Sequence, residues 1–224
     1  MQRYLYRVFL CKKYNMKKLD DSIAVATIKK VVINKGFKWF DNGSKYDLNI
    51  VGIRSKDFVL DSFNDLITVS FFDESGWVCK QYVATVDAGL YYYEHPINKE
   101  GTASLIEGQY LGAFGLGLHK GQYSCLVQIK PLTVNRNSLA QGFPIMGSSD
   151  FGFFAIEIHH AAVNSVVDVV GRYSAGCQVI NNIDDFDEFM SIVNKTKQVG
   201  YVPKFTYTLI NEKDIDNVKQ QVNV

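Results

Sequence analysis

Runs of apolar residues, several of them alternating with polar ones, dominate the chain from about residue 64 onward and predict β-strands. The runs at 65–73 and 77–87 flank the sequence Glu-Ser-Gly at 74–76, a turn signal that favours a hairpin. Further strand-like runs cover residues 111–121, 124–137, 151–161, 179–180 and 204–210. Repeated strands pack as two sheets or close on themselves. We therefore expect a mainly β fold, a β-sandwich or open barrel, with a few helices.

Three segments carry helix signals instead. The sequence Asp-Asp-Ser at 20–22 is an N-cap signature before a mostly apolar stretch, and it predicts a helix over residues 22–35. The polar residues 182–185 cap an amphipathic segment at 186–197, which predicts a second helix. We expect the charged tail beyond Asn211 to be partly helical.

The N-terminal quarter of the chain has a different pattern from the rest. Asn42-Gly43 is a strong tight-turn signal between strand-like runs in the segment 37–55, and it predicts a short hairpin. With the preceding helix, this hairpin makes residues 1–56 a small N-terminal helix-plus-hairpin appendage. Residues 57–224 then form the main β-rich domain.

Composition and charge narrow the class of partner. Apolar residues make up 47% of the 224 residues and charged residues 21%, the balance of an ordinary globular protein that buries a full core. The net charge is only +1, from 24 basic and 23 acidic residues, so no strong field is available to hold a nucleic acid or an anionic membrane. We expect neither as a partner, and the sequence indicates no oligomeric state.

The N-terminal segment bears on where the protein is made. MQRYLYRVFLCKKYNMKK is basic but lacks the apolar core and the small-residue cleavage site of a signal peptide. The chain also contains no apolar run long enough to cross a bilayer. We expect synthesis in the cytoplasm, without a signal peptide or membrane anchor.

Cysteine and histidine spacing argues against a metal centre. The cysteines are Cys11, Cys79, Cys125 and Cys177. No two of them form a CxxC pair, so the spacing supports neither a zinc ribbon nor a disulfide scaffold, and we expect no metal and no cofactor. Cys79 and Cys125 lie in apolar strand-like runs and are interpreted as core thiols. His95 and His119 stand alone in the sequence; we expect both on the surface, and the alternative is that one of them lines the cleft.

One segment has the residues of a nucleophilic site. Cys177 lies 18 residues after His159, which ends a strand-like run. A thiol needs a base or a positive neighbour to react near neutral pH, and imidazole supplies both. Ala175 and Gly176 let a substrate carbonyl approach, the N–H groups of Gly176 and Cys177 are candidates for an oxyanion hole, and Ser174 supports the turn. The alternative, a buried thiol beside a surface imidazole, stays open.

The same segment resembles the active site of the L,D-transpeptidase (YkuD-type) family. That family has a strand ending in Ile-His, a spacer, and then Ser/Thr-His-Gly-Cys; Ile158-His159 matches the first part, and Ser174, Gly176 and Cys177 match the second. The resemblance implies a sandwich fold with Cys177 as the nucleophile and His159 as its base. It also implies that a backbone carbonyl, from His160 or nearby, orients the imidazole.

The chain departs from the family pattern at two positions. Ala175 stands where the family has His, and Val179 stands where it has an Arg that binds the donor peptide. We expect Arg172 and Gln178 to contact the substrate instead. The candidates for a replacement cation are Arg172, Arg136 and Arg54. Small phage- and Bacteroidetes-type proteins with similar runs match at residues 49–54, 63–65, 101–110, 126–128, 158–161 and 174–179.

These observations favour an enzyme that attacks peptidoglycan stem peptides through a thioester on Cys177. The acyl group then passes to an amine, as in an L,D-transpeptidase, or to water, as in a peptidase. A phage-encoded cell-wall enzyme, released at lysis or carried in a virion, fits synthesis in the cytoplasm. The alternatives are a virion structural or wall-binding protein that keeps the fold without catalysis, and a cysteine peptidase or acyltransferase with a substrate outside the wall.

Overall fold

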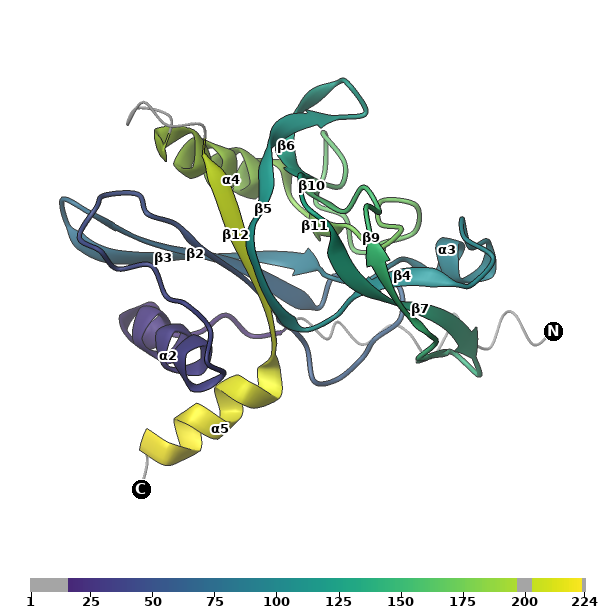
Figure 1. Cartoon of the computed structure of the whole chain (residues 1–224), viewed down its shortest axis with the longest axis horizontal. Coiled ribbons are helices and arrows are strands. Elements are labelled where there is room, and N and C mark those ends of the chain that lie inside the picture. The colour runs from purple at the N-terminus through teal and green to yellow at the C-terminus, as the bar shows by residue number, and fades with distance from the viewer. Residues whose placement is uncertain (1–15, 197–202, 223–224) are drawn as a thin grey trace.

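A computed structural model describes residues 16–196 and 203–222 of the chain. Within these residues the protein is mainly β with a few helices, as the sequence predicts, and its largest sheet closes into a barrel in the order β1-β12-β5-β6-β10-β11-β3-β2 (Figure 1). The barrel strands are β1 (Asn49–Arg54), β2 (Asp65–Asp73), β3 (Gly76–Thr85), β5 (Gly108–His119), β6 (Tyr123–Gln128), β10 (Glu157–His160), β11 (Gln178–Ile180) and β12 (Lys204–Asn211). Closure leaves this sheet without free edges.

A smaller four-stranded sheet lies beside the barrel. It pairs β4 (Thr102–Leu105), β7 (Leu132–Ala140) and β8 (Phe143–Ile145), with β9 (Ser149–Gly152) also on β7. The short helix α3 (Leu90–Glu94) packs near this sheet (Figure 1). Because β9 leads into β10, the smaller sheet meets the barrel next to the strand that ends in His159 and His160.

The main core fills the barrel interior. Tyr82, Phe114 and Tyr207 are among its largest fully buried side chains. Helix α4 (Ile183–Lys195) adds Phe186 and Phe189 to the same cluster. Burying a side chain of this size stabilises a fold by about 1.5–3 kcal/mol, so α4 is an integral part of the barrel core.

Two helices cover another part of the barrel surface. Helices α2 (Asp21–Asn34) and α5 (Glu212–Val222) lie side by side in Figure 1. Both pack on outward-facing residues of β1 and β12, including Val51 and Ile210. Among the helices in the described ranges, none combines the length and apolarity that a membrane span requires.

The predicted helices are confirmed together with their caps. The Asp20 side chain accepts a hydrogen bond from the Ser22 N–H at 2.9 Å before α2. Asn182 does the same for Asp184 at 3.1 Å before α4. The helical tail is α5. The predicted hairpin at residues 65–87 is also present as β2 and β3.

The hairpin predicted around Asn42-Gly43 does not form. Asn42 instead closes a local loop by accepting a hydrogen bond from the Ser44 N–H at 2.9 Å. Strand β1 pairs in parallel with β12 and antiparallel with β2. Hydrogen bonds on both sides of β1 therefore make it a barrel strand, and the barrel begins inside the segment 1–56 that we expected to be an appendage.

The run 151–161, predicted as one strand, is broken in the middle. It belongs partly to β9 and partly to β10, and between them Ala155 has a φ of +54°. The Gln128 side chain holds this break, because its Oε1 accepts hydrogen bonds from the N–H groups of Phe154 (2.8 Å) and Ile156 (3.3 Å). A left-handed conformation is strained for a residue with a Cβ, and here it turns the chain at the start of β10.

Candidate active site

The pairing of β10 with β11 brings Cys177 and His159 to one face. The two strands are parallel, with Ile158 opposite Gln178 and His159 opposite Val179. Side chains alternate between faces along a strand, so Cys177 shares its face with Val179 and His159. Ile158 belongs to the barrel core, whereas Val179 and Cys177 belong to a separate cluster on the outside. The strand register therefore places His159 and Cys177, which immediately precedes β11, on the same outer face of the barrel.

The His159 ring is held in one orientation by a backbone group. Its Nδ1 lies 2.8 Å from the carbonyl oxygen of His160, so this nitrogen donates and Nε2 is left as the acceptor. His159 is only 3% exposed. Burial lowers the pKa of His159 to about 3, although the bond to His160 opposes the shift. The imidazole is therefore neutral at physiological pH.

The Cys177 thiol is half-buried beside the break in the strand. Its Sγ lies 3.6 Å from the carbonyl oxygen of Ala155. Burial raises the pKa of Cys177 to about 11; the backbone N–H of Glu157 and the charge of Lys120 lower it, and the charge of Glu157 raises it further. The thiol is therefore protonated at rest, and Lys120 is the nearby cation that favours the thiolate.

The turn before Cys177 is held by the Ser174 side chain and by the close packing of Gly176. Ser174 Oγ donates to the carbonyl oxygen of Cys177 at 2.8 Å and accepts from the Gly176 N–H at 3.1 Å. Gly176 has a φ of +124°, and a Cβ at this position would lie 2.5 Å from the Ala103 carbonyl oxygen. Ser174 thus supports the turn as expected. The Gly176 N–H already bonds Ser174, so it joins an oxyanion hole only by exchanging that bond.

A cleft of about 450 Å³ opens next to the thiol. Ala155 and Ala175 line it, and these residues flank Cys177 in space and in sequence. Arg136 lines the far wall, where its guanidinium lies 4.8 Å from the Phe154 ring centroid and bonds the Asp150 carboxylate at 2.8 and 3.0 Å. The cleft lies between the smaller sheet and the barrel, and it borders the site through Ala155 and Ala175, while Cys177 and His159 are not among its lining residues.

The other predicted substrate contacts lie elsewhere. Gln178 is fully buried, and its Oε1 accepts a hydrogen bond from the Tyr207 hydroxyl at 2.6 Å, so its side chain faces the barrel core and not a substrate. The Arg172 guanidinium lies 3.8 Å from the Tyr91 ring centroid. Arg54 is bound to the buried carboxylate of Asp87. Of the three arginines considered, Arg136 lines the cleft.

Three residues that the sequence did not assign to the site lie close to it. His119, expected on the surface, is part-buried, with its ring centroid 4.3 Å from that of His159, and its Nδ1 is hydrogen-bonded to the Glu157 carboxylate. Lys120 follows His119 and acts on both Cys177 and His159 through its charge. Glu157 shares strand parity with His159, a signal available in the sequence. The position of His119 depends on the pairing of β5, β6 and β10, and the sequence does not show that pairing.

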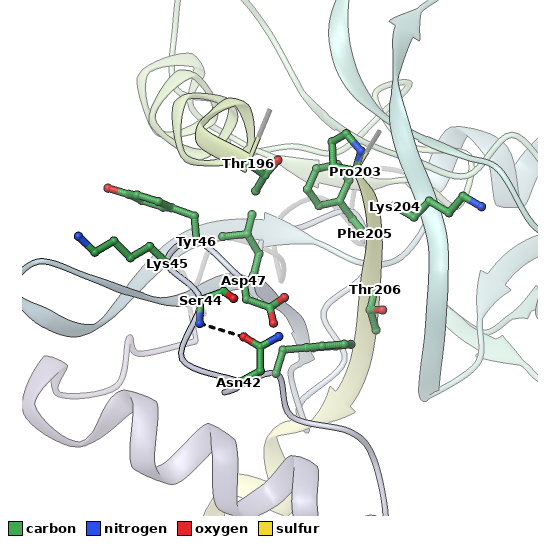
Figure 2. A pocket seen from close by; sticks show the side chains of 12 residues that line it. Asn42, Ser44, Lys45, Tyr46, Asp47, Thr196, Pro203, Lys204, Phe205 and Thr206 are labelled. Carbon is green, nitrogen blue, oxygen red and sulfur yellow. Dashed lines mark hydrogen bonds between the residues drawn. The ribbon is translucent and has the colours of Figure 1, made fainter. Parts of the chain in front are cut away.

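A second cavity lies on another part of the molecule. It measures about 490 Å³, and Figure 2 shows Thr196 and Pro203 on one side of it with Asn42 on the opposite side. Its lining contains no cysteine or histidine. The cavity therefore offers neither a cysteine nucleophile nor a histidine base. Within residues 16–196 and 203–222, no three or more His, Cys, Asp or Glu side chains are arranged to hold a metal ion.

No protein-family model, curated protein or solved structure matches the chain. The geometry around Cys177 and the motif that contains it are therefore what bears on the function of the protein.

Proposed function

We propose that the chain is a cysteine acyl-transfer enzyme of the L,D-transpeptidase (YkuD) type, a peptidase or transpeptidase that acts on peptidoglycan stem peptides. One observation carries this proposal: the register of β10 and β11 places His159 and Cys177, the residue before β11, on one face, and the His160 carbonyl leaves Nε2 of His159 as the proton acceptor. We also propose that the barrel and its adjoining sheet are a variant of the YkuD-type β-sandwich.

The resting site contains a neutral thiol beside a neutral imidazole. The pKa of Cys177 is about 11 and that of His159 is about 3, so a preformed thiolate–imidazolium pair is strongly disfavoured. Proton transfer must then accompany attack on the substrate. Expulsion of water by a bound peptide and the charge of Lys120 both act on this step.

The reaction proceeds through a thioester. The Cys177 S–H proton passes to His159 Nε2 as the sulfur bonds to the amide carbonyl carbon of the substrate. The C–N bond breaks, and the leaving amine takes the proton from His159. An acceptor amine or water then attacks the thioester, the C–S bond breaks, and the thiol re-forms with a new amide or a free acid as product.

The cleft suits a short peptide with small side chains. Ala155 and Ala175 leave little side-chain bulk in the part of the cleft that borders the site. Arg136 offers a cation at the far wall for a substrate carboxylate, although Asp150 already neutralises part of its charge. We propose a phage-encoded enzyme, released at lysis or carried in a virion, as the setting for this activity.

A wall-binding or virion structural protein that lacks catalysis is the second candidate. The raised pKa of Cys177 and its half-buried sulfur favour this alternative, because both are properties of an inert thiol.

The test measures acylation and wall digestion with the same protein samples. Intact protein is incubated with a carbapenem, and covalent adducts are read by mass; purified sacculi are digested and the released muropeptides are identified by mass. We expect an adduct and released products with wild type and neither with Cys177→Ala. Cys79→Ala, which removes another half-buried thiol, is the matched control and should behave as wild type.

A folded wild-type protein that forms no adduct and releases nothing from sacculi would overturn the catalytic proposal. Binding to sacculi that persists unchanged in Cys177→Ala, without released products, would establish the structural alternative.

A further inference from the structure

A second histidine–carboxylate pair lies against the proposed catalytic base. The rings of His119 and His159 stack with an angle of 26° between their planes. His119 Nδ1 is hydrogen-bonded to Glu157, which is two residues before His159 on β10. The pair therefore joins the end of β5 to the strand that carries the base.

Strand register leaves room for this contact. In β5 and β6, Gly117 is opposite Cys125, and β6 continues its pairing to β10 through Leu126 opposite Ile158. Gly117 and Cys125 thus lie on the same face between His119 and His159, and both are small. Val127 covers Gly117, because a Cβ added there would lie 2.6 Å from a Val127 methyl group, so the small Cys125 side chain is what leaves room for the His119 ring to approach β10.

The two histidines differ in their access to solvent. The His119 and Glu157 side chains are 14% and 16% exposed, whereas His159 is 3% exposed. His159 also has its Nδ1 committed to the His160 carbonyl. An incoming water or amine reaches His119 more readily than His159. A histidine whose Nδ1–H is held by a carboxylate has its Nε2 oriented as a base.

We propose that His119, oriented by Glu157, is the general base that activates the acceptor attacking the Cys177 thioester, while His159 serves the thiol in acylation. This proposal rests on the proposed function. In hydrolysis, a proton of water passes to His119 Nε2 as the oxygen bonds to the thioester carbon. The C–S bond breaks, the proton on His119 returns to the departing sulfur, and the products are the free acid and the Cys177 thiol.

Burst kinetics with p-nitrophenyl acetate separate the two half-reactions. The nitrophenolate burst reports acylation of Cys177, and the steady-state rate reports hydrolysis of the thioester. For His119→Gln we expect a burst rate close to that of wild type and a steady-state rate lower by about 10²–10⁴-fold, the usual contribution of a general base. Glu157→Gln keeps an acceptor oxygen but removes the charge, and it should lower the steady-state rate less. His95→Gln, which changes an exposed histidine stacked on Tyr91, is the matched control.

Hydroxylamine tests the role of the lost base directly. This nucleophile attacks thioesters without needing a base, so it should release the acetyl group from His119→Gln as fast as from wild type. An unchanged steady-state rate in His119→Gln would overturn the role of His119 but not the proposed function. An equal decrease of the burst rate and the steady-state rate would do the same, because that result marks a residue that only supports His159. A wild-type protein with no burst and no carbapenem adduct would overturn this proposal together with the proposed function.

Discussion

Arg54, Asp65 and Asp87 (the charge cluster) and His159 and Cys177 (the thiol site) are buried or partly buried ionisable groups in the same barrel, but their bonding differs. In the charge cluster, Asp87 binds Arg54 through two hydrogen bonds of 3.0 and 3.1 Å, and Asp65 accepts two backbone N–H groups at 2.8 Å. In the thiol site, Cys177 makes one long contact and His159 keeps one ring nitrogen open.

The pKa shifts follow this difference in bonding. Burial alone would lower the pKa of Arg54, but the charges of Asp87 and Asp65 outweigh it and raise that pKa above its ordinary value. Arg54 therefore stays charged in the interior. Burial dominates in the thiol site and keeps both groups neutral. A buried group with every position bonded stabilises the fold, whereas one with an open position is available for chemistry.

Removal of one partner from the charge cluster should cause the largest loss of stability. Asp87→Ala leaves Arg54 buried without its main partner and should lower the free energy of unfolding by about 3–5 kcal/mol. Denaturant titration measures the loss. Glu74→Ala breaks the exposed Lys45 pair, in which the side chains are 53% and 72% exposed, and should lower the free energy of unfolding far less, because solvent screens an exposed pair. Equal losses in the two variants would contradict the structural role of the cluster.

The turn that presents the thiol should be the next most sensitive position. Gly176→Ala puts a Cβ against the Ala103 carbonyl in a left-handed conformation and should cost about 2–3 kcal/mol and reduce acylation of Cys177. Gly43→Ala has a similar positive φ with open space around it, so it should cost about 1 kcal/mol and leave acylation unchanged. Thermal unfolding and carbapenem adduct formation measure the two effects. Full acylation in Gly176→Ala would show that the turn is not needed to present the thiol.

The pH dependence of stability distinguishes the two regions by sign. The pKa of His159 is about 3 in the folded protein against an ordinary 6.5, so between these values the unfolded chain binds a proton that the folded protein does not. Above pH 6.5, His159 is neutral in both states and costs the folded protein no stability. As pH falls below 6.5, the free energy of unfolding decreases by at most about 1.4 kcal/mol per pH unit. His159→Gln should flatten this slope in denaturant titrations between pH 4 and 7.

Asp65 contributes with the opposite sign. Burial and the charge of Asp87 raise its pKa, so the folded protein holds a proton there that the unfolded chain has already lost. Its contribution therefore decreases as pH rises from the ordinary value of 3.8 through the raised pKa. Asp65→Asn should remove this slope and leave that of His159. Identical pH profiles for wild type and both variants would contradict the assignment.

The smallest expected effect concerns an arginine near the site. The Arg172 guanidinium lies over the Tyr91 ring, and an exposed contact of this kind is worth about 0.5–1 kcal/mol. Arg172→Ala should change stability by no more than that and leave the digestion of sacculi unchanged. A large rise in the substrate concentration needed for half-maximal digestion would place Arg172 in substrate binding, as the sequence suggests.

The sequence predicts local features of the fold better than distant ones. The caps at Asp20 and Asn182 depend on neighbouring residues, and both are confirmed. The hairpin at Asn42-Gly43 fails because β1 finds better partners in β2 and β12, the latter more than a hundred residues away. Such pairing depends on the whole fold and not on a local pattern.

In the candidate site, too, the residues close together in sequence are predicted and the residue from a distant strand is not. Cys177 and His159 are predicted from a motif within one stretch of chain, and Glu157 follows from strand parity. His119 comes from β5, and only the barrel register places its ring on His159. Gln178 fails as a substrate contact for the complementary reason: strand alternation turns the residue after Cys177 toward the core.

The parallel pairing of β10 with β11 has a consequence for how such a site can be varied or grafted. Parallel neighbours cannot be joined by a hairpin, so the chain must cross over between them through residues 161–177. Hydrogen bonds between the strands set the register of His159 with the residues after Cys177, and the turn at Ser174 and Gly176 holds the thiol; the part of the crossover before that turn only has to be long enough to return. Its length can therefore change without moving either group. The same pair of residues can occur at other separations in other chains, and strand pairing, more than the count of intervening residues, is what a search for such sites should follow.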